Sequence, residues 1–366
     1  NPNGLTDSNP MIDKLKRDLR ALTQDELREQ FKTLTQPAYR ADQVYDWLWS
    51  KEAHSIDDML NLPKALRESL KAIFEIRPIS VNHEQVSKDG TIKNAVRLAD
   101  GLIVESVLIP TDRRITACIS SQVGCNMGCH FCATAKLKRI RNLSPGEIVD
   151  QVRAIQAQAE KHFKRPLTNI VYMGMGEPLA NYRNVLASIE RITSPKGLGI
   201  SAKRITLSTV GLPKLIRRMA DEQVKFNLAV SLHSARDEVR SAIMPVNDAS
   251  NVKDLMDSML YWYEKTGSLI TIEYVVWKDL NDGPEDIQAL VALCKRVPSK
   301  VNLIEYNAIG DGRFQKATLR SIDAYVGALE HAGVTVNIRR SRGKDIDAAC
   351  GQLANKSLPE SMEVLS

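Results

Sequence analysis

From about residue 115 onward, short apolar strand patterns alternate with amphipathic helix patterns, and no other feature constrains the fold of this chain as strongly. Parallel strands need a crossover of a dozen or more residues, usually a helix, so repeated strand–helix units predict a parallel sheet of the α/β class. In barrels of this class the chemistry lies at the carboxyl ends of the strands. The expected strands are residues 115–120, 169–173, 204–208, 226–232, 271–277 and 301–306, with expected helices near 182–193, 213–221, 252–265 and 284–296.

The first third of the chain has a different pattern. Helical periodicity is clearest at residues 39–49 and 57–74, and Asp89-Gly90 is a hairpin signal between two apolar runs. We therefore expect a helical accessory domain followed by a short β extension. The expected division of the chain is the helical domain at 1–78, the β extension at 79–114, the α/β domain at 115–353 and a C-terminal tail at 354–366.

Composition limits the class of protein. The 366 residues are 43% hydrophobic and 26% charged, which is ordinary for a globular protein and argues against extended disorder. No run approaches the ~20 apolar residues of a membrane helix, and the first ten residues contain no apolar stretch like that of a secretory signal. We expect a cytoplasmic protein that does not associate with a membrane, with a monomer as the default state.

Basic residues gather beside cysteines. The formal net charge is +6, a mild excess that many enzymes share. One basic run directly follows a cysteine cluster and another precedes a C-terminal cysteine. Either run alone could be a solvated charged face, but two runs that flank thiols favour a nucleic-acid partner. The runs are Lys136, Lys138, Arg139 and Arg141, and then Arg339, Arg340, Arg342 and Lys344.

The cysteines hold the most chemical information. In a cytoplasmic protein of this size they are expected to be reduced, so a disulfide framework is not expected. Three of them lie in Cys125-Asn-Met-Gly-Cys129-His-Phe-Cys132, where the thiolates can converge on one soft metal centre. A structural zinc site requires four ligands, and the local candidate for the fourth, His130, is expected to point away. Three thiolates without a fourth ligand favour a [4Fe–4S] cluster with one open iron.

This motif, with Phe131 before its last cysteine, resembles that of the radical S-adenosylmethionine (SAM) enzymes. The resemblance implies a partial (β/α)6 barrel and one [4Fe–4S] cluster held by Cys125, Cys129 and Cys132. It also implies that SAM binds the open iron, where an electron from the cluster cleaves it to a 5′-deoxyadenosyl radical.

Small and polar residues end the expected strands, as in Met173-Gly-Met-Gly-Glu-Pro178. As a dinucleotide-binding motif these glycines are a weak signal, because the third glycine of that fingerprint is absent. His233 alone would more often be a core or surface histidine than a catalytic one. By position, the resemblance assigns SAM contacts to Gly176, Glu177, Ser208, Ser231, Leu232, His233 and Asn307.

Two further motifs narrow the resemblance. Cys118-Ile-Ser-Ser-Gln-Val-Gly-Cys125 and Asp345-Ile-Asp-Ala-Ala-Cys-Gly-Gln-Leu353 are similar to motifs of the RNA adenine methyltransferases RlmN and Cfr. This branch implies that Cys350 receives a methyl group from one SAM and that a second SAM generates the radical that activates it. Cys118 then resolves a protein–RNA crosslink through a transient disulfide, and Glu105 accepts a proton. Without the resemblance, Cys350 would be read as a small buried hydrophobe, Glu105 as a charge on a strand face, and Cys294 is expected to be structural.

Two reactions compete within this branch. RlmN-type enzymes methylate C2 of an adenine in the peptidyl-transferase region of 23S rRNA and of the adenine 3′ to the anticodon in some tRNAs, whereas Cfr-type enzymes methylate C8 of that rRNA adenine. Gly176-Glu-Pro-Leu179 and Asp89-Gly-Thr-Ile-Lys93 resemble the RlmN side, and Ile119-Ser-Ser-Gln122 leans the other way.

The expected function is therefore C2 methylation of 23S rRNA and tRNA, with a reductant such as flavodoxin as a partner and RNA docking by the helical domain. C8 methylation is the alternative within the branch. An alternative of a different class is a non-catalytic RNA-binding protein that holds an iron–sulfur cluster or zinc.

Overall fold

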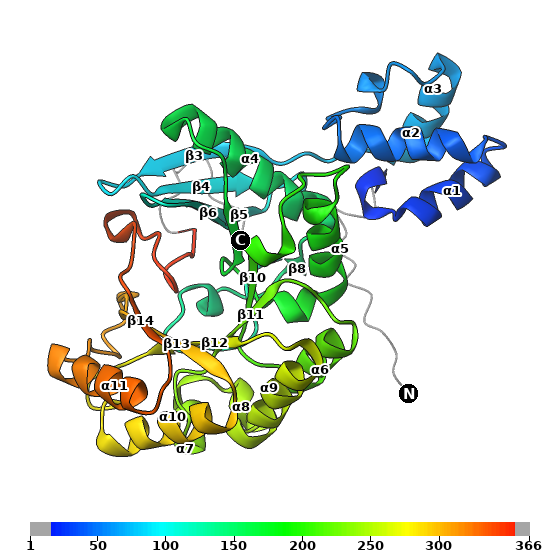
Figure 1. Cartoon of the computed structure of the whole chain (residues 1–366). Coiled ribbons are helices and arrows are strands. Elements are labelled where there is room, and N and C mark those ends of the chain that lie inside the picture. Colours follow the sequence, from blue (N-terminus) through cyan, green and yellow to red (C-terminus); the bar gives the residue numbers. More distant parts are fainter. Residues whose placement is uncertain (1–15, 356–366) are drawn as a thin grey trace.

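The computed structural model describes residues 16–355, and its core is a curved ten-stranded sheet (Figure 1). Seven of the strands run parallel, and each neighbours the next one along the chain. This arrangement confirms the expected α/β barrel. The apolar run at residues 334–338 also predicts a strand, and β14, which lies there, extends the six expected units by one strand. The parallel strands are β6 (Ile115–Cys118), β9 (Asn169–Tyr172), β10 (Ile205–Thr209), β11 (Asn227–Ser231), β12 (Ile270–Val275), β13 (Ser299–Ile304) and β14 (Val336–Arg339).

Three antiparallel strands continue the same sheet beyond β6. The expected Asp89-Gly90 turn joins the first two, and Gly90 adopts φ +83°, a left-handed conformation that favours glycine. The third strand pairs with β6, placing Val107 opposite Cys118, so the β extension and the barrel share one continuous sheet. These strands are β3 (Ser80–Val86), β4 (Ile92–Arg97) and β5 (Ile103–Pro110).

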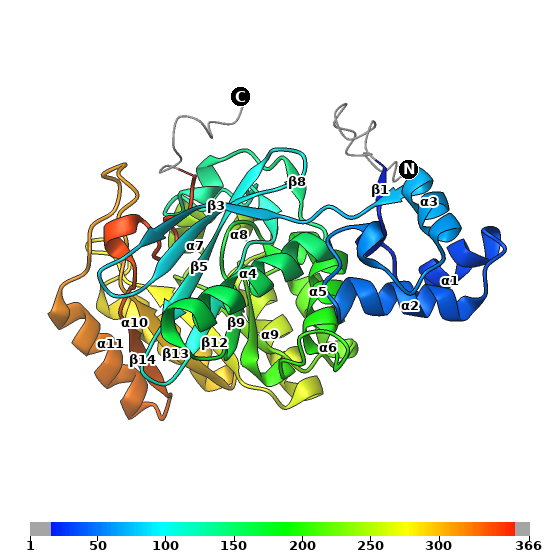
Figure 2. The same cartoon turned by 90° about the horizontal axis from the view of Figure 1, so that it is seen from above.

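Helices cover the outer face of the parallel strands (Figures 1 and 2). The sequence Ser144-Pro-Gly-Glu147 predicts a capping box at the start of the helix α4, and the structure confirms it. Ser144 accepts from the backbone N–H of Glu147, while Glu147 accepts from that of Ser144. Two short helices separated by Pro245, and a longer one after Thr318, were not expected. Among residues 16–355, no helix combines the length and apolar character that a membrane span requires. The helices are α4 (Pro145–Phe163), α5 (Tyr182–Thr193), α6 (Pro213–Asp221), α7 (Asp237–Ile243), α8 (Val246–Ala249), α9 (Val252–Thr266), α10 (Pro284–Arg296) and α11 (Leu319–His331).

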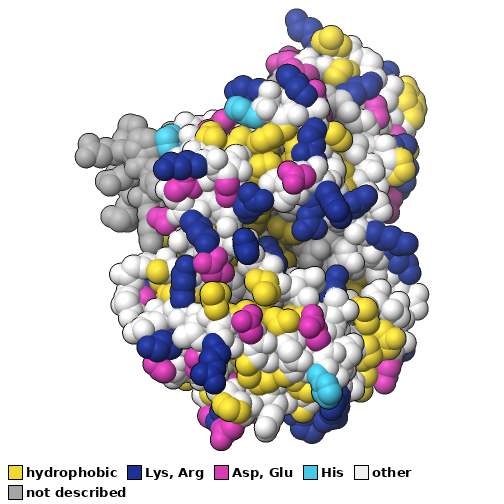
Figure 3. Space-filling model, turned by 60° about the vertical axis from the view of Figure 1, so that its left-hand side comes forward, with side chains coloured by type: hydrophobic (Ala, Val, Ile, Leu, Met, Phe, Trp, Pro, Cys, Tyr) yellow, Lys and Arg dark blue, Asp and Glu magenta, His cyan; other side chains and the backbone are white. Residues whose placement is uncertain are grey.

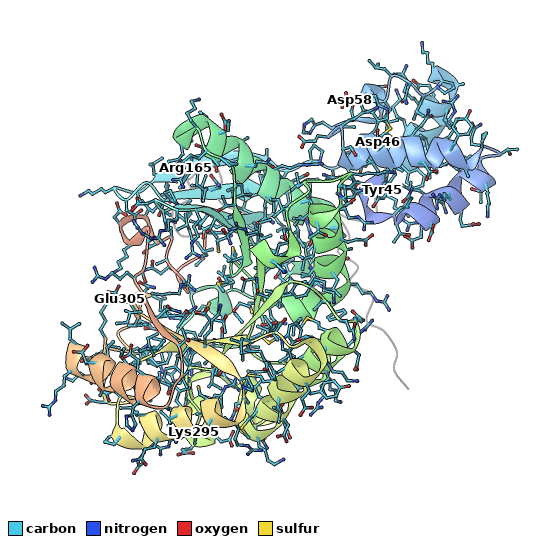
Figure 4. The ribbon with its side chains drawn as sticks, viewed as in Figure 1. Tyr45, Asp46, Asp58, Arg165, Lys295 and Glu305 are labelled. Carbon is cyan, nitrogen blue, oxygen red and sulfur yellow. The ribbon has the colours of Figure 1, made fainter. Side chains whose placement is uncertain are left out.

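A small helical domain lies to one side of the barrel (Figure 2). It contains α1 (Gln24–Thr33), α2 (Ala38–Trp49), on which Figure 4 labels Tyr45 and Asp46, and α3 (Lys64–Ile73). The expectation of one helical segment over 57–74 is wrong. Residues before a proline avoid the helical conformation, so α3 begins only after Pro63, and a separate 3-10 turn occupies Ile56–Asp58.

Two arginines, Arg20 and Arg153, attach the helical domain to the barrel. Arg20, beside the short paired strands β1 (Arg17–Asp18) and β2 (Phe74–Glu75), places Nη1 2.6 Å from Oδ2 of Asp150 on α4. Arg153, also on α4, donates to the carbonyl oxygen of Trp49 at 2.7 Å. Of the divisions expected from the sequence, the start of the helical domain (residues 1–15) and most of the tail (356–366) lie outside the described residues.

Candidate active site at the barrel mouth

The carboxyl ends of β9–β13 border one large cavity, at the edge of the sheet where barrel active sites lie. The empty space inside it, including the solvent at its open mouth, is about 1010 Å³. The structure brings together here every sequence-predicted site residue except Cys118, Leu232 and Glu105. The predicted residues that line this first cavity are Cys125, Cys129, Cys132, Gly176, Glu177, Ser208, Ser231, His233, Asn307 and Cys350.

The three motif cysteines lie on the loop between β7 (Gln122–Val123) and β8 (Arg141–Asn142). Burial raises the pKa of Cys125 to about 11, and burial together with the charges of Cys132 and Cys125 raises the pKa of Cys129. Thiols that oppose one another's ionisation lose their protons when a metal centre compensates the charge.

The donor set matches an iron–sulfur cluster, in which each thiolate binds a different iron. A single metal ion fits less well. Within residues 16–355, no group of three or more Cys, His, Asp or Glu side chains is arranged so that it could bind one metal ion. His130 points away, as expected: its Nδ1 lies 2.9 Å from the carbonyl oxygen of Ala242 on α7.

Three rings, one of them on the cysteine loop, pack against one another next to the motif cysteines. The ring of Phe131 meets the ring of His233 edge-on, with centroids 4.7 Å apart, and lies 5.1 Å from the ring of Trp277. His233 accepts from the backbone N–H of Val275 through Nδ1, and burial lowers the pKa of His233 to about 3. His233 is therefore a neutral, fixed imidazole and is unsuited to hold a proton near neutral pH.

Glu177 is an oriented carboxylate at the cavity wall. It is 2% exposed; Oε1 accepts from the N–H of Leu179 and Oε2 from the N–H of Val210, each at 2.9 Å. Burial raises the pKa of Glu177, and these two hydrogen bonds oppose that rise by favouring the charged form. Gly176 precedes it at φ +97°, and a Cβ there would lie 2.5 Å from Cβ of Gln122, so the turn requires glycine. Such a carboxylate is suited to bind the ammonium group of an amino acid.

Two of the predicted SAM contacts are placed differently from the rest. Leu232 is fully buried and does not line the cavity; its carbonyl oxygen accepts from Nε of Arg240. Asn307 lines the cavity but donates from Nδ2 to the carbonyl oxygen of Cys350 at 3.3 Å. Asn307 therefore links the cavity wall to the segment that contains the C-terminal thiol.

A second cavity adjoins the first and contains the other predicted thiol. Cys118 lines it, and both cavities share Met173, Ile304, Arg339 and Cys350. Burial, with the neighbouring Cys350 thiol, raises the pKa of Cys118 to about 12, and Arg339 opposes this rise. The pKa of Arg339 is raised chiefly by the neighbouring Cys350, and its guanidinium favours the ionised form of Cys118. All six cysteines are free.

Glu105 lines neither cavity. It is 2% exposed on β5, with Oε1 3.5 Å from Nζ of the equally buried Lys93 on β4. Its other oxygen, Oε2, accepts from the backbone N–H groups of Ala354 and Asn355 at 2.8 and 3.1 Å. The expected proton acceptor therefore contacts the segment that follows Cys350.

Sequence reasoning missed one charged pair of the first cavity. Oε2 of Glu273 lies 3.2 Å from Nη1 of Arg339, and Oε1 of Glu273 accepts from Asn302. In the sequence, Arg339 stands out only as part of a basic run, and no motif contains Glu273. The signal was present, because Glu273 is a lone carboxylate in the otherwise apolar strand β12, and buried carboxylates require a partner.

Comparisons with known proteins agree with this arrangement. Residues 119–293 match the family model of the radical SAM superfamily, and residues 17–76 match that of the ribosomal RNA large subunit methyltransferase N-terminal domain. The chain is 60% identical over 342 residues to a probable dual-specificity RNA methyltransferase RlmN of Christiangramia forsetii, covering 93% of this chain and 97% of that protein. It is 40% identical over 357 residues to the dual-specificity RNA methyltransferase RlmN of Campylobacter fetus subsp. fetus, covering 94% of this chain and 99% of that protein.

A solved structure extends the likeness to three dimensions. A radical SAM methyltransferase from Sphaerobacter thermophilus superimposes with a TM-score of 0.84 at 38% identity, covering 92% of this chain and 99% of that one. Radical SAM enzymes use SAM and a [4Fe–4S] cluster, and the cysteine-lined cavity is a suitable place for both. The relatives match nearly the whole chain, from the helical domain to the barrel, and the chain belongs to the RlmN family of radical SAM RNA methyltransferases.

Proposed function

We propose that this enzyme methylates C2 of an adenine in the peptidyl-transferase region of 23S rRNA, and of the adenine 3′ to the anticodon in some tRNAs. The observation that supports this most strongly is the position of Cys350, which lines both cavities. On one side it faces the three-cysteine loop, and on the other it faces Cys118. A thiol placed in this way can take a methyl group in the first cavity and transfer it to a base in the second.

The target carbon explains the need for a radical. C2 of adenine is electron-poor and has no lone pair, so it cannot displace the methyl group of SAM directly. A [4Fe–4S] cluster bound by Cys125, Cys129 and Cys132 would supply the electron that cleaves SAM to a 5′-deoxyadenosyl radical. Cys350 first acts as a thiolate nucleophile and takes a methyl group from one SAM. After this S-methyl group loses a hydrogen atom to the radical from a second SAM, its methylene carbon bonds to C2.

Glu105 and Cys118 would resolve the adduct. Glu105 accepts the C2 proton, and the Cys118 thiolate attacks Sγ of Cys350, which breaks the S–CH2 bond and leaves a disulfide with one extra electron. That electron would return to the oxidised iron–sulfur cluster, which gave up one electron to cleave SAM, and a proton from solvent completes the methyl group of the product. A reductant such as flavodoxin then returns the disulfide to two thiols.

The surface around the second cavity is suited to RNA. Arg114, Arg340 and Arg342 line this cavity, and Figure 3 shows Lys and Arg side chains gathered around a hollow in one face. Phosphate contacts provide most of the affinity for nucleic acid, and the reacting base must leave its stack. We place the target adenine in the second cavity and more distant RNA on the helical domain. We also propose that the protein acts as a monomer, because one chain supplies every group of the site, and that it works in the cytoplasm, where its proposed RNA substrates are found.

The position of the new methyl group tests the proposal. Cluster-loaded protein, SAM, a reductant and an rRNA fragment with the target adenine are incubated anaerobically, and the RNA is digested to nucleosides. We expect 2-methyladenosine. If the product is 8-methyladenosine, the proposed roles of the two cavities still hold, but the enzyme has Cfr-type specificity for C8 and not RlmN-type specificity for C2. Absence of any methylated adenine from protein with an intact cluster would contradict the proposal.

Replacement of Glu177 tests the SAM site. Glu177→Gln keeps the shape of the side chain but removes the charge offered to the SAM ammonium group, a hydrogen bond of about 1.5–3 kcal/mol. We expect the KM for SAM to rise roughly 10- to 100-fold with a smaller change in kcat. Glu190→Gln is the matched control, because Glu190 is 72% exposed on the outer side of α5. An unchanged KM for Glu177→Gln would remove Glu177 from the site.

A further inference from the structure

The segment that contains Cys350 is attached to the antiparallel strands, although more than 200 residues separate them in the chain. We call residues 343–355 the thiol segment. Three residues fix its first end. The N–H of Gly343 donates to Oδ2 of Asp89, and the Asp345 carboxylate accepts from the hydroxyl of Ser87 and from the N–H of Lys88. Lys344 forms an ion pair with Glu305. Glu305, labelled in Figure 4, directly follows the last residue of β13. These contacts keep the first end in place.

The middle and the last end of the thiol segment make different contacts. The carbonyl oxygens of Gly351 and Leu353 accept from Ala133 N–H and Thr134 Oγ1 on the cysteine loop, at 2.7 and 2.6 Å. The last end rests on Glu105, whose Oε2 receives the N–H groups of Ala354 and Asn355. Asn355 also donates from Nδ2 to the carbonyl oxygen of Ile103 at 3.0 Å.

The contacts of Glu105 conflict with its proposed role in the reaction. Oε2 already accepts two N–H groups, Oε1 faces the Lys93 ammonium group, and the residue lines neither cavity. An adenine in the second cavity cannot transfer a proton to a carboxylate that the thiol segment covers.

We propose that Glu105 is also a positioning residue, which holds the last end of the thiol segment until the RNA adduct forms on Cys350. Adduct formation then displaces residues 354–355, and the carboxylate that this uncovers takes the C2 proton. This inference rests on the proposed function for its second half, the release. Its first half, the contact in the free enzyme, is independent of it.

Amide hydrogen exchange tests the contact directly. In cluster-loaded protein without SAM or RNA, the amides of Ala354 and Asn355 should be protected, because both donate to a buried acceptor. Glu105→Ala should accelerate their exchange at least about tenfold, whereas Glu105→Gln retains an acceptor oxygen and should keep most of the protection. Glu84→Ala, on strand β3 of the same sheet, is the matched control. Equal exchange in Glu105→Ala and the unmodified enzyme would overturn the proposal.

The release is tested in the trapped adduct. In Cys118→Ala protein crosslinked to RNA, the two amides should exchange at least about tenfold faster than in the free protein, and retained protection would overturn the proposal. Ala354→Pro provides a second variant, because proline removes one donated N–H and leaves Glu105 and Lys93 in place. It should speed exchange at Asn355 and still complete methylation, whereas Glu105→Gln should stop at the crosslink. Failure of the unmodified enzyme to methylate adenine would count against the proposed function alone, since the exchange in free protein is measured without substrate.

Discussion

Replacing Cys350 with alanine is expected to abolish adenine methylation, whereas replacing Cys118 with alanine is expected to stop the reaction at a covalent protein–RNA complex. Loss of a nucleophile that forms a covalent intermediate removes the reaction path, so we expect activity to fall at least about 10³-fold in either variant. The two variants differ in what accumulates. Cys350→Ala leaves unmodified RNA, while Cys118→Ala leaves RNA attached to Cys350 because no thiol attacks its sulfur. Denaturing gels and the mass of the peptide that contains Cys350 separate the two outcomes.

Cys294→Ala is the matched control for both thiols. Cys294 is a buried cysteine on α10 that lines neither cavity, so its removal should leave turnover within a factor of about three. The pH dependence gives a further check: since the pKa of Cys118 is raised to about 12, its reactive thiolate is scarce at pH 8, and crosslink resolution should accelerate as the pH rises. A crosslink that resolves normally in Cys118→Ala would exclude Cys118 as the resolving thiol.

Most of the barrel could be predicted from the sequence, because parallel strands and their crossover helices have distinct periodicities. Each expected strand from residue 115 onward is present within a few residues of its predicted bounds. The elements that escaped prediction lack such a signal. The helices α7 and α8 are short and are separated by Pro245. The helical periodicity over residues 57–74 continues across Pro63, although in the structure α3 begins only after this proline. Hydrophobic periodicity shows which face of a helix is apolar, but it does not show at which residue a proline ends or begins that helix.

The site was predictable to the extent that its residues occur in contiguous motifs. The loop with Cys125, Cys129 and Cys132 and the Gly176-Glu177 turn are local features, and the structure brings both to one cavity. Long-range pairing was not predictable in this way. The ion pair between Glu273 and Arg339 joins residues 66 positions apart, and the contact of Glu105 with residues 354–355 spans about 250 positions. Such contacts depend on the sheet order, which no single motif encodes.

Replacing any one of Cys125, Cys129 or Cys132 with alanine is expected to remove both the iron–sulfur cluster and all SAM cleavage. Only three thiolates are available on this loop, so the loss of one leaves one iron of the cluster without its cysteine ligand. The purified unmodified protein should be brown, with broad absorbance at about 400 nm. Each variant should lose this colour, and its activity should fall by a factor of at least about 10³.

His130→Ala is the control that separates an iron–sulfur cluster from zinc. His130 lies inside the motif, yet its ring contacts the carbonyl oxygen of Ala242, so we expect this variant to keep its colour and its turnover within a factor of about three. A four-ligand zinc site would instead need His130, and its removal would then release the metal. Colourless protein with one zinc per chain, lost in His130→Ala, would overturn the assignment of the three cysteines. Brown protein that is unaffected by His130→Ala and bleached by each cysteine variant would establish these three thiols as the ligands.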